Sequence, residues 1–302
     1  MDSPVPYNLT HGRDWMLPIV VSAPHAGVEV PPGFSMPTGP RKNAIEAMSD
    51  TNVNRVAISA GQTLGFPVLS SRYLRAFIDL NRELGELDPE LIEGVDPRQA
   101  KIHPGSRLAA GLGLIPRLAD PKTPIYAKKL DMQEVRSRIA QVYIPYHDTL
   151  QSLIDECLDR FGVCFLIDLH SMPPLTPAVA RRSLALSPDQ PSKRLRLFPD
   201  SPTNFVMGDR FGATLSKSQS RAARIFWQER GYTVSQNHPY SGGFITETYG
   251  QHIPALQVEI CRRLVPGTYL TDASLAIEES FGEFAETMAQ TLFRGSSREA
   301  AE

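Results

Sequence analysis

Two histidines, His25 and His170, each end a short hydrophobic run that is followed at once by turn-forming residues. Such runs, rich in β-branched and aromatic residues and bounded by Gly and Pro, are typical of buried strands in a parallel sheet. Ligands bind where the strands of these sheets end. Two imidazoles brought to one edge from distant parts of the chain therefore predict a metal site. The alternative is that both histidines merely cap strands.

A catalytic zinc site usually takes three protein ligands and leaves one position for water, whose pKa it lowers to about 7. Three carboxylates could supply the third ligand. Glu29 follows His25 by four residues, and Glu46 and Asp50 lie four residues apart on one face of the next expected helix. The residues alone leave all three open, and a solvated helix carboxylate is the alternative for Asp50.

Zinc hydrolysis also needs a carboxylate that is not a ligand, to move a proton from water to the leaving amine. Glu259 is the candidate, because it lies in the strand-like segment 253–260. A charge there is costly to bury unless it has a function or a partner. The alternative is a buried ion pair with Arg262 or Arg263.

The segment 75–82 carries arginines at both ends of a short apolar run. Because guanidinium groups bind carboxylates with two parallel hydrogen bonds, Arg75 and Arg82 are candidates to hold an acidic substrate or polarise its carbonyl group. Asn81 beside them is a further candidate for substrate binding. Asp79 could instead form an internal salt bridge with either arginine.

Four further signals are weaker. The pair Gly242 and Gly243 would let the backbone approach a substrate closely. Asp168 could orient an imidazole or pair with an arginine. His147 is better explained by helix packing than by catalysis. The Pro- and Arg-rich insertion 173–202 could reshape a pocket, although a solvated surface loop explains it better.

Composition excludes several classes of function. The formal net charge of the 302 residues is −2, which predicts no basic surface for nucleic acid or anionic membranes. No apolar run is long enough for a transmembrane helix, and the N-terminus lacks the pattern of a secretory signal. The three cysteines form no CxxC pair and suit a reducing compartment. A cytoplasmic protein that acts on a small molecule is expected, with its oligomeric state left open.

Strands and helices alternate in the expected order of elements. Helices are expected over 42–60, 127–160 (with a break at Pro145), 215–230 and 270–293. Strands are expected over 66–70, 74–80, 204–207, 232–236 and 255–260, and a long loop over 81–123. This order predicts one α/β domain, 1–293, with a doubly wound, mostly parallel sheet flanked by helices, and a flexible tail, 294–302.

Taken together, the motifs resemble those of the N-formylglutamate amidohydrolase (deformylase) family. They follow the family's order from Leu17 to Arg263, which is most of the chain. The matching positions are 22–27, Asp50, 75–82, His103–Gly105, Tyr126, 145–147, 168–172, Gly208–Asp209, 242–246 and 257–259.

The resemblance implies a fold like that of zinc carboxypeptidases and aspartoacylases, one divalent metal ion, and hydrolysis of a small amide. Those relatives carry a carboxylate three residues after the first histidine, where this chain has Val28. The deformylase family has an aspartate farther along, which Asp50 matches, so Asp50 is preferred to Glu29 and Glu46. The chain departs from the deformylases of histidine breakdown at 52–54, where they have another acid and a Trp-His pair.

The resulting hypothesis is a zinc-dependent amidohydrolase that cleaves a small acidic N-acyl amino acid, with N-formyl-L-glutamate as the expected substrate. The expected zinc ligands are His25, Asp50 and His170. Glu259 would move the proton, and Arg75 or Arg82 would hold a substrate carboxylate, with Arg75 also assigned to the oxyanion. The alternatives are a hydrolase of other N-acyl amino acids, short peptides or cell-wall fragments, and a non-catalytic relative that binds a metal or small ligand.

Overall fold

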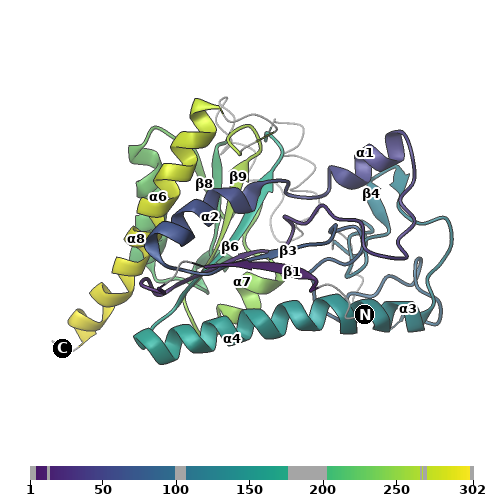
Figure 1. Cartoon of the computed structure of the whole chain (residues 1–302), viewed down its shortest axis with the longest axis horizontal. Coiled ribbons are helices and arrows are strands. Elements are labelled where there is room, and N and C mark those ends of the chain that lie inside the picture. The colour runs from purple at the N-terminus through teal and green to yellow at the C-terminus, as the bar shows by residue number, and fades with distance from the viewer. Residues whose placement is uncertain are drawn as a thin grey trace.

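A seven-stranded sheet in the order β1-β3-β2-β6-β9-β7-β8 forms the centre of the computed structural model (Figure 1). The structure describes residues 5–11, 14–98, 107–175, 203–265, 267 and 271–299. The strands are β1 (Tyr7–Thr10), β2 (Ile19–Ala23), β3 (Val68–Ser71), β6 (Phe165–Met172), β7 (Phe205–Gly208), β8 (Val234–Gln236) and β9 (Ala255–Cys261). Strands β3, β2, β6 and β9 are parallel, whereas β1 and β7 run antiparallel to β3 and β9.

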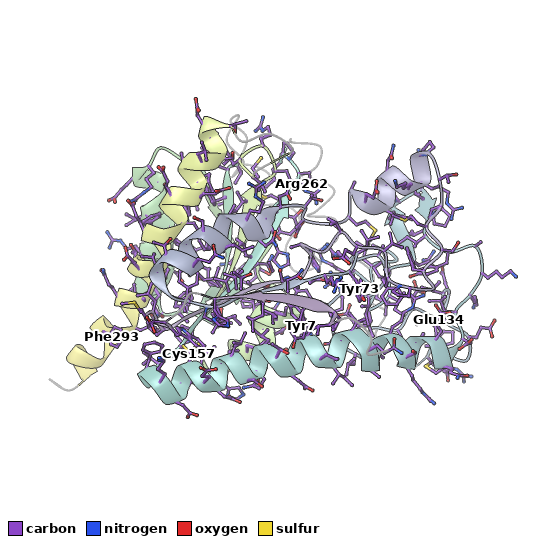
Figure 2. All side chains as sticks on the ribbon, in the orientation of Figure 1. Tyr7, Tyr73, Glu134, Cys157, Arg262 and Phe293 are labelled. Carbon is purple, nitrogen blue, oxygen red and sulfur yellow. The ribbon has the colours of Figure 1, made fainter. Side chains whose placement is uncertain are left out.

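Helices cover both faces of this sheet, which confirms the predicted α/β fold with a mostly parallel sheet. The helices are α1 (Pro40–Glu46), α2 (Val53–Leu64), α3 (Met132–Arg138), α4 (Ile144–Phe161), α6 (Lys217–Glu229), α7 (Phe244–Tyr249) and α8 (Asp272–Glu299). Along β2, Ile19 and Val21 pack into the core shared with α2, α6 and α8, and Val20 packs into the core shared with α4 and α7. On the α4 side, Cys157 is fully buried between the helix and the sheet (Figure 2).

The predicted helix 42–60 is divided in two, because α1 ends at Glu46 and the chain stays non-helical until α2 begins at Val53. The backbone N–H of Asp50 donates to the carbonyl of His25 at 2.8 Å, which joins the loop between α1 and α2 to the end of β2. Asn52 follows in a left-handed conformation (φ 64°) and starts α2. The interruption thus brings a carboxylate to the edge of the sheet.

The predicted strand 74–80 is wrong, since this segment forms turns. The Asp79 carboxylate accepts the backbone N–H of Asn81 at 2.9 Å, and the N–H of Phe77 donates to the carbonyl of Leu74 at 2.9 Å. The hydroxyl of Tyr126 donates to the carbonyl of Ala76 at 2.9 Å. Most apolar side chains of the segment are buried, but its backbone is held by side chains and turns rather than by a neighbouring strand.

The predicted helix 127–160 begins later, at Met132, and continues past Pro145 without the predicted break. A π-helical turn, Ile139–Tyr143, joins α3 to α4 just before this proline. The wider turn lets the helix accommodate a residue that has no backbone N–H to donate. The fused helix runs under the whole sheet and the loops beside it (Figure 1).

The other predicted elements agree within a few residues, although α8 extends to Glu299 and so includes much of the predicted tail 294–302. In the described residues of the loop 81–123, the regular structure is confined to its end, where β4 (Leu118–Asp120) pairs with β5 (Thr123–Pro124). The motif His103–Gly105 and the insertion 173–202 beyond residue 175 lie outside the described residues. No helix in the described part of the chain is long and apolar enough to cross a membrane.

Candidate metal and hydrolytic site

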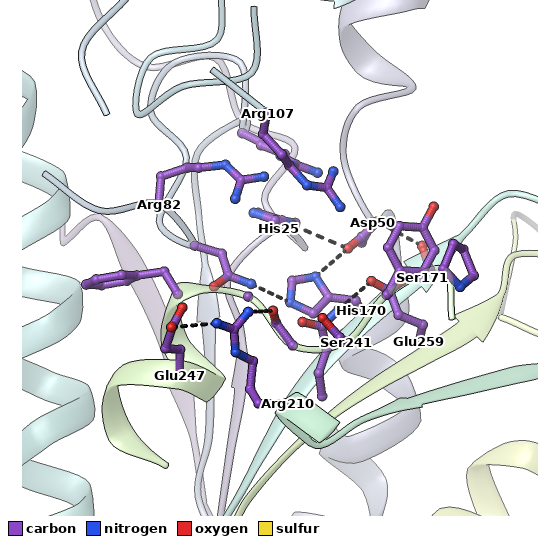
Figure 3. Close-up of a pocket in the computed structure, with 18 of the residues that line it drawn as sticks. His25, Asp50, Arg82, Arg107, His170, Ser171, Arg210, Ser241, Glu247 and Glu259 are labelled. Atoms are coloured by element: carbon purple, nitrogen blue, oxygen red, sulfur yellow. Dashed lines mark hydrogen bonds and ion pairs between the residues drawn. The ribbon is translucent and has the colours of Figure 1, made fainter. Parts of the chain in front are cut away.

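Three side chains predicted as metal ligands meet at the carboxyl ends of β2 and β6. His25 lies two residues after the end of β2, Asp50 comes from the loop between α1 and α2, and His170 lies near the end of β6. The Oδ2 atom of Asp50 is 3.0 Å from Nδ1 of His170 and 3.7 Å from Nδ1 of His25. The two imidazole rings converge, as the predicted metal site requires, and their centroids lie 4.7 Å apart (Figure 3).

The opposite nitrogen of each ring is held by a second carboxylate. Nε2 of His25 is 2.6 Å from Oδ1 of Asp79, and Nε2 of His170 is 3.0 Å from Oδ1 of Asp168. Both carboxylates are fully buried. A carboxylate that accepts the N–H at Nε2 fixes the tautomer and leaves Nδ1 with a lone pair for a metal ion. The prediction that Asp168 orients an imidazole agrees with this contact.

The donor set fits a divalent metal ion. Ligand atoms of His25, Asp50 and His170 lie within 4.8 Å of one another, and all three residues are buried. Oδ2 of Asp50 lies within 3.7 Å of Nδ1 of both histidines, so one small ion could be held by all three residues. Burial raises the pKa of Asp50, but its hydrogen bonds with both histidines outweigh burial and hold that pKa well below its usual range. A carboxylate that stays ionised beside two imidazoles is what such an ion needs.

The two other carboxylates considered as third ligands are bound elsewhere. Glu29 pairs with Arg72, with Oε2 at 2.8 Å from Nε, and Glu46 pairs with Lys42 at 3.4 Å. About half of each glutamate side chain is exposed to solvent. The geometry therefore favours Asp50 over both.

Arg262, at the end of β9, holds the Asp50 carboxylate from the side opposite the histidines. Its Nη2 is 3.2 Å from Oδ1 of Asp50, and the same guanidinium donates to the carbonyls of Ala47 and Ser49. The hydroxyl of Ser171 also donates to Oδ1, at 3.1 Å. With Oδ1 occupied, Oδ2 is the oxygen that faces the imidazoles.

We expect Arg262→Ala to weaken metal binding by about 10- to 100-fold, the usual cost of losing a group that orients a ligand. The loss follows from releasing both the Asp50 carboxylate and the 47–50 loop. Titration with zinc in competition with a chelator measures the affinity. The neighbouring Arg263 is exposed, so Arg263→Ala serves as the matched control. Equal affinities of the two variants would assign Arg262 a role in loop packing alone.

Glu259, the predicted proton carrier, lies directly across from His170 in the β6–β9 register. It is 7% exposed and lines the pocket beside the three candidate ligands. Burial raises its pKa to about 7. The ion pair considered as the alternative is absent from the described residues, since Arg262 pairs with Asp50 and Arg263 is exposed. A carboxyl group with a pKa near neutrality can both accept and return a proton.

The predicted arginines of the segment 75–82 both face Asp79. Nη2 of Arg75 is 2.8 Å from Oδ2 of Asp79, and Nε of Arg82 is 3.7 Å from the same oxygen. The salt bridge considered from the sequence is therefore present, and Asp79 also binds His25. Arg75 interacts electrostatically with Asp50 and Glu259. Both arginines line the pocket, so neither pairing removes them from it.

Asn81, predicted to bind substrate, has internal partners at both ends of its amide. Its Oδ1 accepts the backbone N–H of Ile245 at 2.8 Å. Its Nδ2 lies 3.0 Å from Nε2 of His170 and donates to Oδ2 of Asp168 at 3.3 Å. Gly243 packs against this amide so closely that a Cβ atom would lie 2.4 Å from Nδ2. Gly242 has φ 120°, a conformation that side chains rarely adopt. These contacts favour positioning of the site over direct substrate binding for Asn81.

His147 lies outside the pocket, in agreement with the packing role favoured from the sequence. Its Nε2 donates to the carbonyl of Leu80 at 2.9 Å, and its Nδ1 accepts from the Tyr249 hydroxyl at 3.0 Å. Burial lowers its pKa to about 4, so the ring is neutral near pH 7. The side chain supports the segment that carries Asn81.

The pocket around these residues has a volume of about 380 Å³ and contains two arginines that the sequence analysis missed, Arg107 and Arg210 (Figure 3). Arg107 comes from the loop 81–123. Arg210 follows β7 in a left-handed conformation (φ 52°), and its Nη2 pairs with Glu247 at 2.5 Å. Arg210 stands next to the motif Gly208–Asp209, which is the only signal in the sequence that could have pointed to it.

Comparison with known proteins connects this site to one family. The model of the N-formylglutamate amidohydrolase family matches residues 17–265. The N-formylglutamate deformylase of Pseudomonas putida is 26% identical over 256 residues, which cover 82% of this chain and 80% of that protein. The deformylase of Pseudomonas aeruginosa is 24% identical over 283 residues, covering 90% and 92%.

Solved structures agree with this connection. N-formylglutamate amidohydrolase from Ralstonia eutropha JMP134 superposes with a TM-score of 0.79 at 30% identity, covering 96% of this chain and 99% of that one. A gene product of Agrobacterium tumefaciens, 15% identical with a TM-score of 0.64, shares the fold. Because the family model spans most of the chain, this protein belongs to the N-formylglutamate amidohydrolase family.

Proposed function

We propose that this protein hydrolyses N-formyl-L-glutamate to formate and L-glutamate with the aid of one zinc ion. The observation that carries the proposal is the placement of Glu259, whose pKa is raised to about 7, beside the cluster of His25, Asp50 and His170. A proton-transfer group next to a three-ligand site with room for water is the arrangement that metal-assisted amide hydrolysis requires.

When bound by His25, Asp50 and His170, zinc would polarise the formyl carbonyl and make water acidic enough to act near pH 7. The Glu259 carboxylate accepts the proton of the attacking water and returns it to the leaving nitrogen, so no proton is gained or lost overall. Arg75, which is close to the charges of Asp50 and Glu259, stabilises the developing oxyanion. Arg82 holds a carboxylate of the substrate.

The substrate is inferred from two sources. The relatives from the two Pseudomonas species and from Ralstonia are named for activity on N-formylglutamate. The pocket is also rich in arginine, which suits an amino acid with two carboxylates. Both point to a small acidic N-acyl amino acid rather than to a peptide.

The direct test is an assay of the zinc-loaded protein against a panel of N-formyl and N-acetyl amino acids, with release of the free amine as the readout. N-formylglutamate is expected to give the highest kcat/KM. N-formylglutamine, which differs only in the loss of the side-chain charge, is the matched neutral substrate. A preference for N-acetyl or neutral substrates would contradict the proposal, as would activity that survives removal of the metal by a chelator.

A further inference from the structure

Five arginines line the pocket: Arg75, Arg82, Arg107, Arg210 and Arg262. Three of them each bind a carboxylate of the protein closely: Arg75 binds Asp79, Arg210 binds Glu247 and Arg262 binds Asp50. Their charges are therefore largely balanced within the pocket wall. The two that remain, Arg82 and Arg107, lie on the same side of the pocket, next to His25 (Figure 3).

Arg82 lacks a close partner of its own. Its Nε is buried and makes no hydrogen bond in the described part of the chain. The nearest carboxylate oxygen, Oδ2 of Asp79, is 3.7 Å away and already binds Arg75 at 2.8 Å. Burial and the positive charges of Arg107 and Arg75 lower the pKa of Arg82 to about 10. An anion bound beside this guanidinium would therefore offset its burial and the repulsion from Arg107 and Arg75.

Arg107 makes no close ion pair within the described part of the chain, although its positive charge acts on Glu259 and on Arg82. Its guanidinium carbon lies 5.8 Å from the centre of the Tyr240 ring. Two like charges directed into one pocket repel each other unless a negative group lies between them. A carboxylate is the anion that matches two guanidinium groups, since each of its oxygens can accept hydrogen bonds from one of them.

We propose that Arg82 and Arg107 together bind the side-chain carboxylate of the substrate, and that Arg107 sets the preference for acidic over neutral N-acyl amino acids. This inference rests on the proposed function, because it assigns one end of that substrate. The α-carboxylate is one carbon from the amide nitrogen and must lie close to the reacting groups. That part of the pocket is the side of Arg75, because Arg75 is the arginine that interacts with both Asp50 and Glu259. The side-chain carboxylate of glutamate lies farther along the molecule, where Arg82 and Arg107 are free to bind it.

The test compares Arg107→Gln with wild type in two measurements. Calorimetric titration with glutarate, a dicarboxylate that cannot be hydrolysed, is expected to show a Kd raised by about 10- to 100-fold, the usual effect of losing a hydrogen bond to a charged group. KM is expected to rise similarly for N-formylglutamate and to stay nearly unchanged for N-formylglutamine. Arg107→Lys, which keeps the charge but loses the fork of donors, is expected to fall between the two.

Arg98, an exposed arginine of the same loop, provides the control variant Arg98→Gln, which should behave as wild type in both measurements. An unchanged Kd for glutarate in Arg107→Gln would overturn the inference, and so would equal increases of KM for the charged and neutral substrates. The glutarate titration needs no turnover. If the wild type cleaved no formyl substrate but bound glutarate more tightly than Arg107→Gln, the subsite would be supported and the proposed reaction would be contradicted.

Discussion

Replacing Glu259 by glutamine is expected to reduce kcat by about 10²- to 10⁴-fold, the usual contribution of a positioned acid–base group. Glutamine keeps the size and shape of the side chain but cannot accept a proton from water. Because Glu259 is not one of the three candidate metal ligands, the zinc content should remain that of wild type. Steady-state kinetics and metal analysis of the same preparation measure both quantities.

The pH profile provides a second readout for the same residue. A general base works only when it is ionised, and burial raises the pKa of Glu259 to about 7. A bound cation would favour the ionised form, so kcat/KM of the wild type should fall as the pH drops from about 7 toward the usual carboxyl range. The residual activity of Glu259→Gln should lack this decline.

The control for this substitution is Glu279→Gln, the same chemical change at an exposed position of α8. It is expected to leave kcat, the pH profile and the metal content unchanged. Wild-type turnover in Glu259→Gln would remove this residue from the mechanism. Loss of metal together with activity would instead indicate that the substitution distorts the cluster.

The sequence was informative about the ligands because they are attached to regular elements. His25 and His170 end hydrophobic runs, and the carboxyl ends of parallel strands meet at one edge of a sheet. Glu259 was found for a related reason, since an ionisable residue inside a strand needs a partner or a function. In each case the local pattern predicts both the strand and the edge of the sheet at which its side chain lies.

The groups that support these ligands were harder to predict. Asp79 was assigned to a strand, and its contact with His25 depends on turns that are held by distant residues, among them Tyr126. Arg107 lies in a loop with no hydrophobic period, so nothing local indicates which way it points. Arg210 reaches the pocket because its backbone is left-handed, which its residue type does not suggest.

Arg262 shows a different reason for the same difficulty. From the sequence, Arg262 and the adjacent Arg263 are equally plausible ion-pair partners for Glu259. The side chains of adjacent residues at the end of a strand point to different sides, and the exposed Arg263 could not be distinguished from the pocket-lining Arg262 without the register. Only the tertiary structure shows which of the two neighbouring arginines faces the pocket.

Replacing His170 by alanine should abolish both metal binding and turnover. His170 is 3% exposed, and it supplies one of only two imidazoles in the cluster. Removing a group that merely orients a ligand costs about 10- to 100-fold in affinity, so loss of the ligand itself should exceed about 100-fold. The substitution also leaves Asp50 and Asp168, which both contact this ring, without their partner.

A folded protein that binds a metal is stabilised by it, so the melting temperature distinguishes loss of metal binding from loss of the fold. Adding zinc should raise the Tm of the metal-free wild type and have no effect on His170→Ala. His252→Ala, at an exposed histidine remote from the cluster, should respond to zinc as wild type does. If His170→Ala bound zinc as tightly as the wild type, the convergence of the two imidazoles would have no role in metal binding. The assignment of these residues as metal ligands would then be wrong.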